Sequence, residues 1–195
     1  CDFLGTWVSP LEYTAGYTAT RSAAKLLEKG GVDAVKKNMS LHVQFESGMT
    51  LTGSNADNRV LIRPSEQPLA VAKLHNAIAN KVGGSTVSAS GSFAWAKADQ
   101  AIAKTAENLL QNAGRSIVVS GLNDISIQMM VNNINDMLGN YNKTMSFEGA
   151  SLQRQGSDRA INNLIDSMGS VDAVIVMGGA NPAYDIPGRA AEFAE

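Results

Sequence analysis

Residues 41–64, LHVQFESGMTLTGSNADNRVLIRP, carry the pattern on which the predicted fold depends. Apolar and polar side chains alternate over residues 41–45, which is the period of a β-strand with one buried face. The alternation stops at residues 46–48, Glu-Ser-Gly, and a second apolar run occupies residues 60–62. Pro64 ends that run because proline has no N–H for a sheet. We therefore expect a strand, a loop open to a ligand or a neighbouring strand, and a second strand.

Helical periodicity follows this stretch and recurs along the chain. Ser65 and Pro68 mark a helix start, and Gly30 marks the end of an earlier helix that begins at Ser9. Residues 31–40 are predicted to be a solvated loop. The helices are predicted at residues 9–28, 65–79, 97–113, 125–138 and 158–168, with a last one opening at Pro187.

The remaining strands are predicted from β-branched runs at residues 116–121 and 171–177, with a further short strand at residues 144–147. Residues 171–177, VDAVIVM, are expected to be central and buried on both faces. Helices that alternate with strands imply a mostly parallel sheet. The sequence thus predicts a three-layer, doubly wound, Rossmann-like α/β fold with helices on both faces. We expect one domain over residues 1–195, with residues 83–96 as a flexible internal loop.

Composition excludes several classes of function. The 195 residues include 16 Lys+Arg and 18 Asp+Glu, so a net charge of −2 gives the chain as a whole no electrostatic footprint for nucleic acid or an anionic membrane. No apolar run approaches the ~20 residues of a membrane-spanning helix. One cysteine and two histidines cannot supply an iron–sulfur cluster or a structural zinc site, each of which needs about four ligands. The chain opens at Cys1 rather than Met, which suggests a piece of a longer protein.

The candidate reactive side chains have structural explanations. His42 and His75 are far apart in the sequence, and each is expected to pack on the face of an element, so we nominate no general base. No serine lies in a nucleophile elbow. Asp57 and Arg63 are predicted to form a buried ion pair that braces residues 41–64. The sequence therefore nominates no catalytic residue and no metal site.

Residues 46–67 resemble a segment of the molybdopterin oxidoreductases of the dimethyl sulfoxide reductase type, D-P-R-x-T-x-T-A-x-x-A-D-x-W-x-P-I-R-P-G-T-D. In that family the segment leads from a strand into a helix and helps to hold the guanine dinucleotide tail of the cofactor. The matching residues are Thr50, Thr52, Ala56, Asp57, Ile62, Arg63 and Pro64. The departures are Glu46-Ser47-Gly48 for D-P-R, Arg59 for the tryptophan, and Ser65-Glu66-Gln67 for G-T-D. The resemblance implies that the positions that shape the backbone are kept and those that read the nucleotide are altered.

Two further segments resemble the same family. Residues 178–182, Gly-Gly-Ala-Asn-Pro, match its G-x-N-P loop, which follows a strand and lies along the pterin. By itself such a loop is more often a turn that needs glycine for its own geometry. Here it follows residues 41–79 in the family's chain order, and residues 2–7, DFLGTW, match a segment that lies at the carboxyl end of a strand.

Within the family, the chain is most similar to the iron–sulfur subunit of alternative complex III, a bacterial quinol:cytochrome c oxidoreductase. The similarity is carried by DFLGTWVSPLEY at residues 2–13, HVQFES at residues 42–47 and LTGSNAD at residues 51–57. It implies a respiratory electron-transfer subunit that keeps the oxidoreductase fold without the molybdenum cofactor. It also implies iron–sulfur clusters elsewhere in the parent protein and attachment to other subunits of a membrane-associated complex on the periplasmic side. Neither nucleic-acid binding nor direct membrane insertion is expected.

Ligands of parallel sheets bind beyond the carboxyl ends of the strands. The expected feature is a vestigial cofactor cleft lined by Glu46, Gly48, Asp57, Arg63, Gly121, Gly179 and Asn181. Glu46 would repel a phosphate-bearing tail, and Gly48 stands where the family's arginine would offset that charge. The expected function is therefore a structural domain without a cofactor, a fragment of a larger oxidoreductase subunit.

Two other functions stay open on the sequence. One is a domain of an active molybdenum bis-pterin oxidoreductase, such as a polysulfide or tetrathionate reductase, which would bind molybdopterin guanine dinucleotide. The other is a free-standing α/β module that binds a small nucleotide. Ligand analysis distinguishes the three, because the cofactor-free domain is expected to hold neither a pterin nor a nucleotide.

Overall fold

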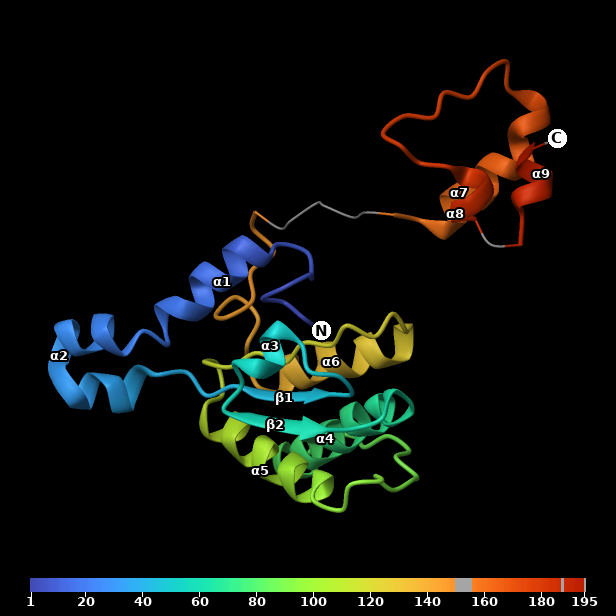
Figure 1. The fold of residues 1–195 in the computed structure, drawn as a ribbon. Coiled ribbons are helices and arrows are strands. Elements are labelled where there is room, and N and C mark those ends of the chain that lie inside the picture. Colours follow the sequence, from blue (N-terminus) through green and yellow to red (C-terminus); the bar gives the residue numbers. More distant parts are fainter. Residues whose placement is uncertain (150–155, 187, 195) are drawn as a thin grey trace. The chain divides into compact units, whose positions relative to one another are not determined.

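The computed structural model describes residues 1–149, 156–186 and 188–194 of the chain, which divides into two compact units, Cys1–Ser151 and Leu152–Glu195. The first unit contains α1 (Pro10–Ala19), α2 (Ala23–Asn38), β1 (Val43–Glu46), α3 (Leu51–Ser54), β2 (Asn58–Leu61), η1 (Pro64–Glu66), α4 (Gln67–Val82), α5 (Ala98–Gln111) and α6 (Ile125–Met137) (Figure 1). The second contains α7 (Asp158–Ser167), η2 (Met168–Ser170), α8 (Pro182–Asp185) and α9 (Ala190–Ala194). Within the described ranges, no helix combines the length and apolar character needed to cross a membrane.

The sheet of the first unit has two parallel strands, β1 and β2. Val43 lies opposite Asn58 at one end of the ladder, and Glu46 lies opposite Leu61 at the other. Both strands predicted within residues 41–64 are confirmed, and the chain is a mixed α/β protein as expected. No further strand joins this sheet in the described part of the chain.

The two faces of this sheet differ in chemistry. Val43, Phe45 and Val60 pack in or against the apolar core, whereas Gln44 and Glu46, which alternate with them, are buried polar residues. Figure 1 shows α4 and α5 on one side of the strands and α3 on the other. The apolar face predicted from the alternation of side chains therefore rests on the helices of the core.

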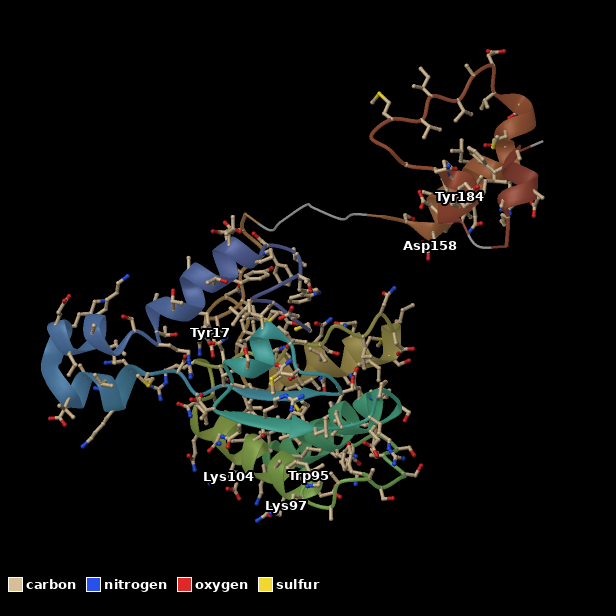
Figure 2. The ribbon with its side chains drawn as sticks, viewed as in Figure 1. Tyr17, Trp95, Lys97, Lys104, Asp158 and Tyr184 are labelled. Atoms are coloured by element: carbon tan, nitrogen blue, oxygen red, sulfur yellow. The ribbon has the colours of Figure 1, made fainter. Side chains whose placement is uncertain are left out.

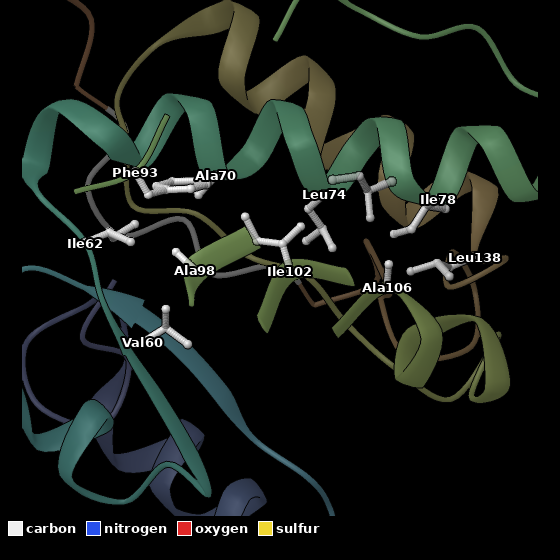
Figure 3. Packing of buried hydrophobic residues seen from close by; sticks show 11 residues of the cluster. Val60, Ile62, Ala70, Leu74, Ile78, Phe93, Ala98, Ile102, Ala106 and Leu138 are labelled. Atoms are coloured by element: carbon white, nitrogen blue, oxygen red, sulfur yellow. The ribbon is translucent and has the colours of Figure 1, made fainter. Parts of the chain in front are cut away.

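The core lies among α4, α5 and α6, and Figure 3 shows Leu74 and Ile78 of α4 facing Ile102 and Ala106 of α5. Its members are Val60, Ile62, Ala70, Leu74, Ile78, Phe93, Ala98, Ile102, Ala106, Ile134 and Leu138. Apolar residues three and four apart place one stripe of each helix on this cluster. The helices predicted at residues 65–79, 97–113 and 125–138 thus supply most of this core, whereas Phe93 comes from the segment predicted to be a flexible loop.

Helix starts in the second half of the chain follow the sequence signals. Asp124, immediately before α6, accepts the N–H of Ile127 at 2.9 Å. Ser157, before α7, accepts the N–H of Ala160 at 3.2 Å. Both side chains satisfy a backbone donor that the helix leaves unpaired. The last predicted helix start, Pro187, lies outside the described residues.

The single helix predicted at residues 9–28 is wrong, because the structure has two helices there, α1 and α2. The loop predicted at residues 31–40 is also wrong, since α2 continues through most of it. Gly30 and Gly31, which were expected to end a helix, instead interrupt α2 with non-helical dihedral angles. Gly31 has a φ of 67°, which glycine adopts without the steric cost of a Cβ.

The strand predicted at residues 116–121 is absent from the structure, although its burial alternates as a strand's would. The side chain of Asn135 takes the place of a strand partner. The Val118 N–H donates to its Oδ1 at 3.0 Å, and its Nδ2 donates to the Val118 carbonyl at 2.7 Å. Asn140 holds the same Oδ1 through its own amide at 3.0 Å. Buried backbone groups require hydrogen bonds, and here a side-chain amide supplies them.

The strand predicted at residues 171–177 is also not a strand in the structure, and the expectation that it is buried on both faces is wrong. Val174 is 39% exposed and Ile175 is 84% exposed. A strand needs a hydrogen-bonding neighbour, and the described residues of the second unit form only helices and irregular segments. Residues 144–147 likewise contribute one isolated bridge, at Met145, rather than a strand.

We expect Ile134→Ala to lower the free energy of unfolding by about 2–5 kcal/mol, because Ile134 is fully buried and its truncation leaves a cavity. Urea denaturation followed by circular dichroism measures this change. Ile125→Ala, in the same helix but at an 81% exposed position, is the matched control and should change stability by less than about 0.5 kcal/mol. Equal effects at both positions would contradict the placement of the core.

Candidate functional site

Glu46 lies at the end of β1, and its carboxylate is bound within the chain. Glu46 as a whole is only 5% exposed. Thr50 Oγ1 donates to one carboxylate oxygen at 2.7 Å, and Arg59 Nε, on the neighbouring strand β2, donates to the other. Burial alone would raise the pKa of Glu46, but the hydrogen bonds from Arg59 and Thr50 outweigh it and hold the pKa below its usual value. Glu46 is therefore a buried anion with its own counter-charge.

The charge of Glu46 is balanced by Arg59, contrary to the prediction from the sequence. The charge of Glu46 was predicted to lack an offset because Gly48 replaces the family's arginine, but Arg59 supplies that offset from β2. Gly48 itself is exposed, and a Cβ built there would meet nothing within 4 Å. Gly53 is necessary on the other side, since a Cβ there would lie 1.9 Å from a Glu46 carboxylate oxygen. The Glu46 carboxylate thus occupies the space beside Gly53, in the loop that follows β1.

The first residues of the chain bind the loop that follows β1. Asp2 Oδ1 accepts the backbone N–H and the hydroxyl of Thr52 at 3.0 and 2.8 Å. The Leu4 N–H donates to the same hydroxyl at 2.9 Å. Thr52 is fully buried, and its N–H and hydroxyl have their partners in the N-terminal segment, whereas its carbonyl accepts the N–H of Asn55. This segment therefore closes one side of the loop.

Gly121 lies against the same N-terminal segment. A Cβ at Gly121 would come 3.0 Å from the Cβ of Cys1, so the absence of a side chain allows this approach. The amide of Gln44, on the polar face of β1, donates to the Cys1 carbonyl at 3.2 Å. The structure thus brings the start of the chain, β1 and Gly121 together.

Asp57 pairs with Arg21, and the ion pair predicted between Asp57 and Arg63 is wrong. Two guanidinium nitrogens of Arg21 donate to the two carboxylate oxygens at 2.7 and 2.8 Å. The backbone N–H of His42 adds a third hydrogen bond at 2.7 Å. The hydrogen bond from Arg21 outweighs burial and lowers the pKa of Asp57 to about 2. Asp57 therefore joins the segment before α2 to the segment before β1.

His42 belongs to an aromatic cluster beside this ion pair. The ring of His42 lies 5.6 Å from Phe3 and 5.5 Å from Tyr17, between centroids. The Tyr17 hydroxyl, at the sheet side of α1 (Figure 2), lies 3.1 Å from His42 Nδ1 and donates to the carbonyl of Asn55 at 2.8 Å. Burial lowers the pKa of His42 and raises that of Tyr17. These contacts agree with a packing role for the histidine.

Glu66 stands where the family has the threonine of G-T-D, and its carboxylate accepts backbone N–H groups at the start of the helix. Its carboxylate oxygens accept the N–H of Arg63 at 2.7 Å and the N–H of Ala94 at 2.6 Å. It thereby performs the capping that the sequence assigned to Ser65, through the turn η1. The side chain of Arg63 lies on the surface.

Gly179 and Asn181, the other predicted cleft residues, belong to the second unit. Gly178 and Gly179 have φ values of 77° and 76°, in the left-handed region that glycine adopts readily. The N–H of Asn181 donates to Asp185 at 2.9 Å, at the start of α8. These features fit the simple interpretation of a turn. That Gly179 and Asn181 share a cleft with Glu46 stays a prediction.

A shallow groove of about 690 Å³ lies between β2 and α5, and no sequence motif pointed to it. Among its lining residues are Arg59 and Val60 from β2, and Trp95, Lys97 and Lys104 near or on α5 (Figure 2). Of the predicted cleft residues only Asp57 reaches it. Across the described ranges, no three His, Cys, Asp or Glu side chains converge as metal ligands would.

We expect Arg59→Gln to lower the free energy of unfolding by about 1.5–3 kcal/mol, because it leaves the buried Glu46 carboxylate without its charged partner. Adding Glu46→Gln should restore part of that loss. Lys104→Gln removes an exposed ion pair with Glu107 and should cost less than about 0.5 kcal/mol. Denaturant titrations of the four proteins measure these differences, and an Arg59 effect no larger than the Lys104 effect would contradict the assignment.

Asp57 predicts a pH dependence of stability. The folded pKa of Asp57, about 2, lies below the ordinary aspartate value of 3.8, so its stabilising effect is present above pH 3.8 and is lost as the pH falls through about 2. The stability gap between the natural chain and Asp57→Asn should therefore be largest near neutral pH and shrink toward pH 2. Denaturation curves over this range test the sign, and a gap that widens on acidification would contradict it.

Comparison with known proteins adds no relative to this geometry. No protein-family model matches the chain, and no curated protein sequence matches it significantly. The resemblance to molybdopterin oxidoreductases is therefore carried by the motifs at residues 2–13, 42–67 and 178–182, and the function that follows from it is a proposal.

Proposed function

We propose that the chain is a cofactor-free structural domain of a molybdopterin-oxidoreductase-like subunit in a respiratory quinol:cytochrome c oxidoreductase. The parent subunit would carry its iron–sulfur clusters elsewhere and bind the other subunits of the complex on the periplasmic side. The domain supplies shape and rigidity to that subunit, and its own side chains perform no redox step.

One observation carries this proposal. At the positions where the family reads its nucleotide, the side chains of this chain bind other groups of the same chain. Glu46 is held by Thr50 and Arg59, and Glu66 is held by the N–H groups of Arg63 and Ala94. A carboxylate that already has its donors gains little from a ligand and loses much if the ligand displaces them. Conversion of a binding loop into a structural brace explains both replacements.

The guanine dinucleotide of the family does not fit these residues. Its phosphates would approach two carboxylates, Glu46 and Glu66, in place of the donors that an anion needs. Arg59 already pairs with Glu46 through its Nε, so the negative charge of Glu46 offsets its attraction for any phosphate that approaches its remaining N–H groups. Gly48 offers a backbone N–H without a charge. The chemistry of this donor set therefore supports a domain that has lost the cofactor.

The proposal includes a wider sheet than β1 and β2. Residues 116–121 and 171–177 keep the β-branched composition of parallel strands, and in the intact subunit we propose that they join a three-layer, Rossmann-like sheet. The alternating burial of residues 116–120 and the hydrogen bonds of Val118 to a surrogate amide support this for the first of the two segments.

Calorimetric titration with guanosine diphosphate tests the proposal directly. We expect no measurable heat of binding at millimolar nucleotide, and elemental analysis of the purified chain should find no stoichiometric iron or molybdenum. The matched variant carries the family's residues, Glu46→Asp, Ser47→Pro and Gly48→Arg with Ser65→Gly, Glu66→Thr and Gln67→Asp. It should gain weak nucleotide affinity and lose stability, because Glu66→Thr removes the acceptor of two backbone N–H groups.

Contrary results would point to the other functions. Tight binding of guanine nucleotides by the natural chain would overturn the scaffold proposal and revive the active bis-pterin oxidoreductase. Elution of a different nucleotide with the purified protein would favour the free-standing binding module.

A further inference from the structure

The helix α2 carries a local positive charge, although acidic residues outnumber basic residues in the whole chain. Its sequence, AAKLLEKGGVDAVKKN, contains four lysines and two acidic residues, whereas the chain as a whole has a net charge of −2. The four lysines, Lys25, Lys29, Lys36 and Lys37, are all exposed. Within the described residues none of them forms an ion pair. Their charges are therefore available to a partner.

Exposed apolar side chains accompany these lysines. Leu27 is 46% exposed, Val32 is 60% exposed, and Met39, which follows the helix, is 40% exposed. Val32 and Val35, three residues apart in the segment after Gly31, lie on one helix stripe, and Lys36 follows Val32 by one turn. Gly30 and Gly31 divide α2 into two segments, and each segment combines hydrophobic and cationic character: Leu27 accompanies Lys25 and Lys29 in the first, and Val32 and Met39 accompany Lys36 and Lys37 in the second.

This surface stands away from the core of its unit. Leu26 is the single buried residue of α2, and Figure 1 shows α1 and α2 projecting from the side of the sheet. The segment just before α2 is fixed by the Arg21–Asp57 ion pair and by a hydrogen bond from Arg21 to the Ser40 carbonyl at 2.6 Å. Residues 23–39, which we call the α2 arm, are therefore fixed where they join the unit and exposed on their outer side.

The composition of the arm favours a lipid surface over a protein. The cores of protein interfaces are enriched in aromatic residues and arginine and depleted in lysine, whereas α2 has four lysines and no aromatic or arginine. At a bilayer surface, lysines keep their charge among the head groups while their aliphatic stems lie along apolar neighbours. Each lysine near an anionic surface strengthens binding by about fivefold.

We propose that the α2 arm is a peripheral membrane-binding element that recognises anionic phospholipid head groups. Leu27, Val32 and Met39 enter the interface between head groups and acyl chains, and the lysines bind the phosphates. The contact lies at the surface and inserts no helix across the bilayer. This inference is independent of the proposed scaffold function, because it rests on α2 and not on the residues that replace the nucleotide site.

Co-sedimentation of the full chain with vesicles tests the proposal. Vesicles of pure phosphatidylglycerol should bind the chain, vesicles of pure phosphatidylcholine should bind it at least about tenfold less, and added sodium chloride should weaken the first interaction. The variant with Lys25, Lys29, Lys36 and Lys37 all changed to Gln should lose at least about tenfold in affinity for phosphatidylglycerol. Circular dichroism confirms that each protein is folded.

The matched control changes four exposed lysines elsewhere, Lys81, Lys97, Lys104 and Lys143, to Gln. It alters net charge equally, and Lys97 and Lys104 lie on the α5 side of the unit (Figure 2), so its affinity should stay within about threefold of the natural chain. Equal losses in both variants would overturn a specific role for α2. The membrane proposal would also be overturned if the chain did not bind phosphatidylglycerol, or if salt did not weaken that binding. An acidic protein surface would then be the next partner to test. Because no nucleotide is present, these results are separate from the test of the scaffold function.

Discussion

The first unit depends on how a carboxylate is kept charged inside a small parallel sheet. Glu46 is buried at the end of β1, and an isolated carboxylate in that position would be protonated or would destabilise the fold. Arg59 on β2 and Thr50 in the following loop keep it ionised and link the end of β1 to β2 and to this loop. Gly53 leaves the necessary room, and the N-terminal segment covers the loop through Asp2 and Thr52. The carboxylates of Glu46 and Asp2 thus join β1, β2, the loop after β1 and the N-terminal segment.

Local patterns in the sequence predicted the part of the fold that local interactions determine. Helical periodicity located the helices of the core, and the predicted starts at residues 125 and 158 agree with those of α6 and α7, because caps and apolar stripes act over a few residues. Strand assignments at 116–121 and 171–177 were wrong for this structure, since a β-branched run becomes a strand only beside another strand. The composition of a segment does not specify which strand, if any, pairs with it.

The candidate site was predictable as a location and not as a set of contacts. The position of Glu46 near the end of a predicted strand was visible in the sequence. Its pairing with Arg59, thirteen residues later, depends on the parallel pairing of β1 with β2. Asp57 was expected to pair with a nearby arginine, whereas Arg21 reaches it from a distant segment. Averaging charge over the whole chain likewise hid the lysines of α2. Long-range geometry decides each of these cases.

The attachment of the arm also has a mechanical consequence. Two contacts, Tyr17 with Asn55 and Arg21 with Asp57, anchor α1 and the start of α2 to the short connection that leads into β2. A force that pulls α2 away from the unit therefore acts on these contacts as well as on residues 39–42, which join α2 to β1. Displacement of Arg21 with the arm would leave Asp57 without the guanidinium that lowers its pKa.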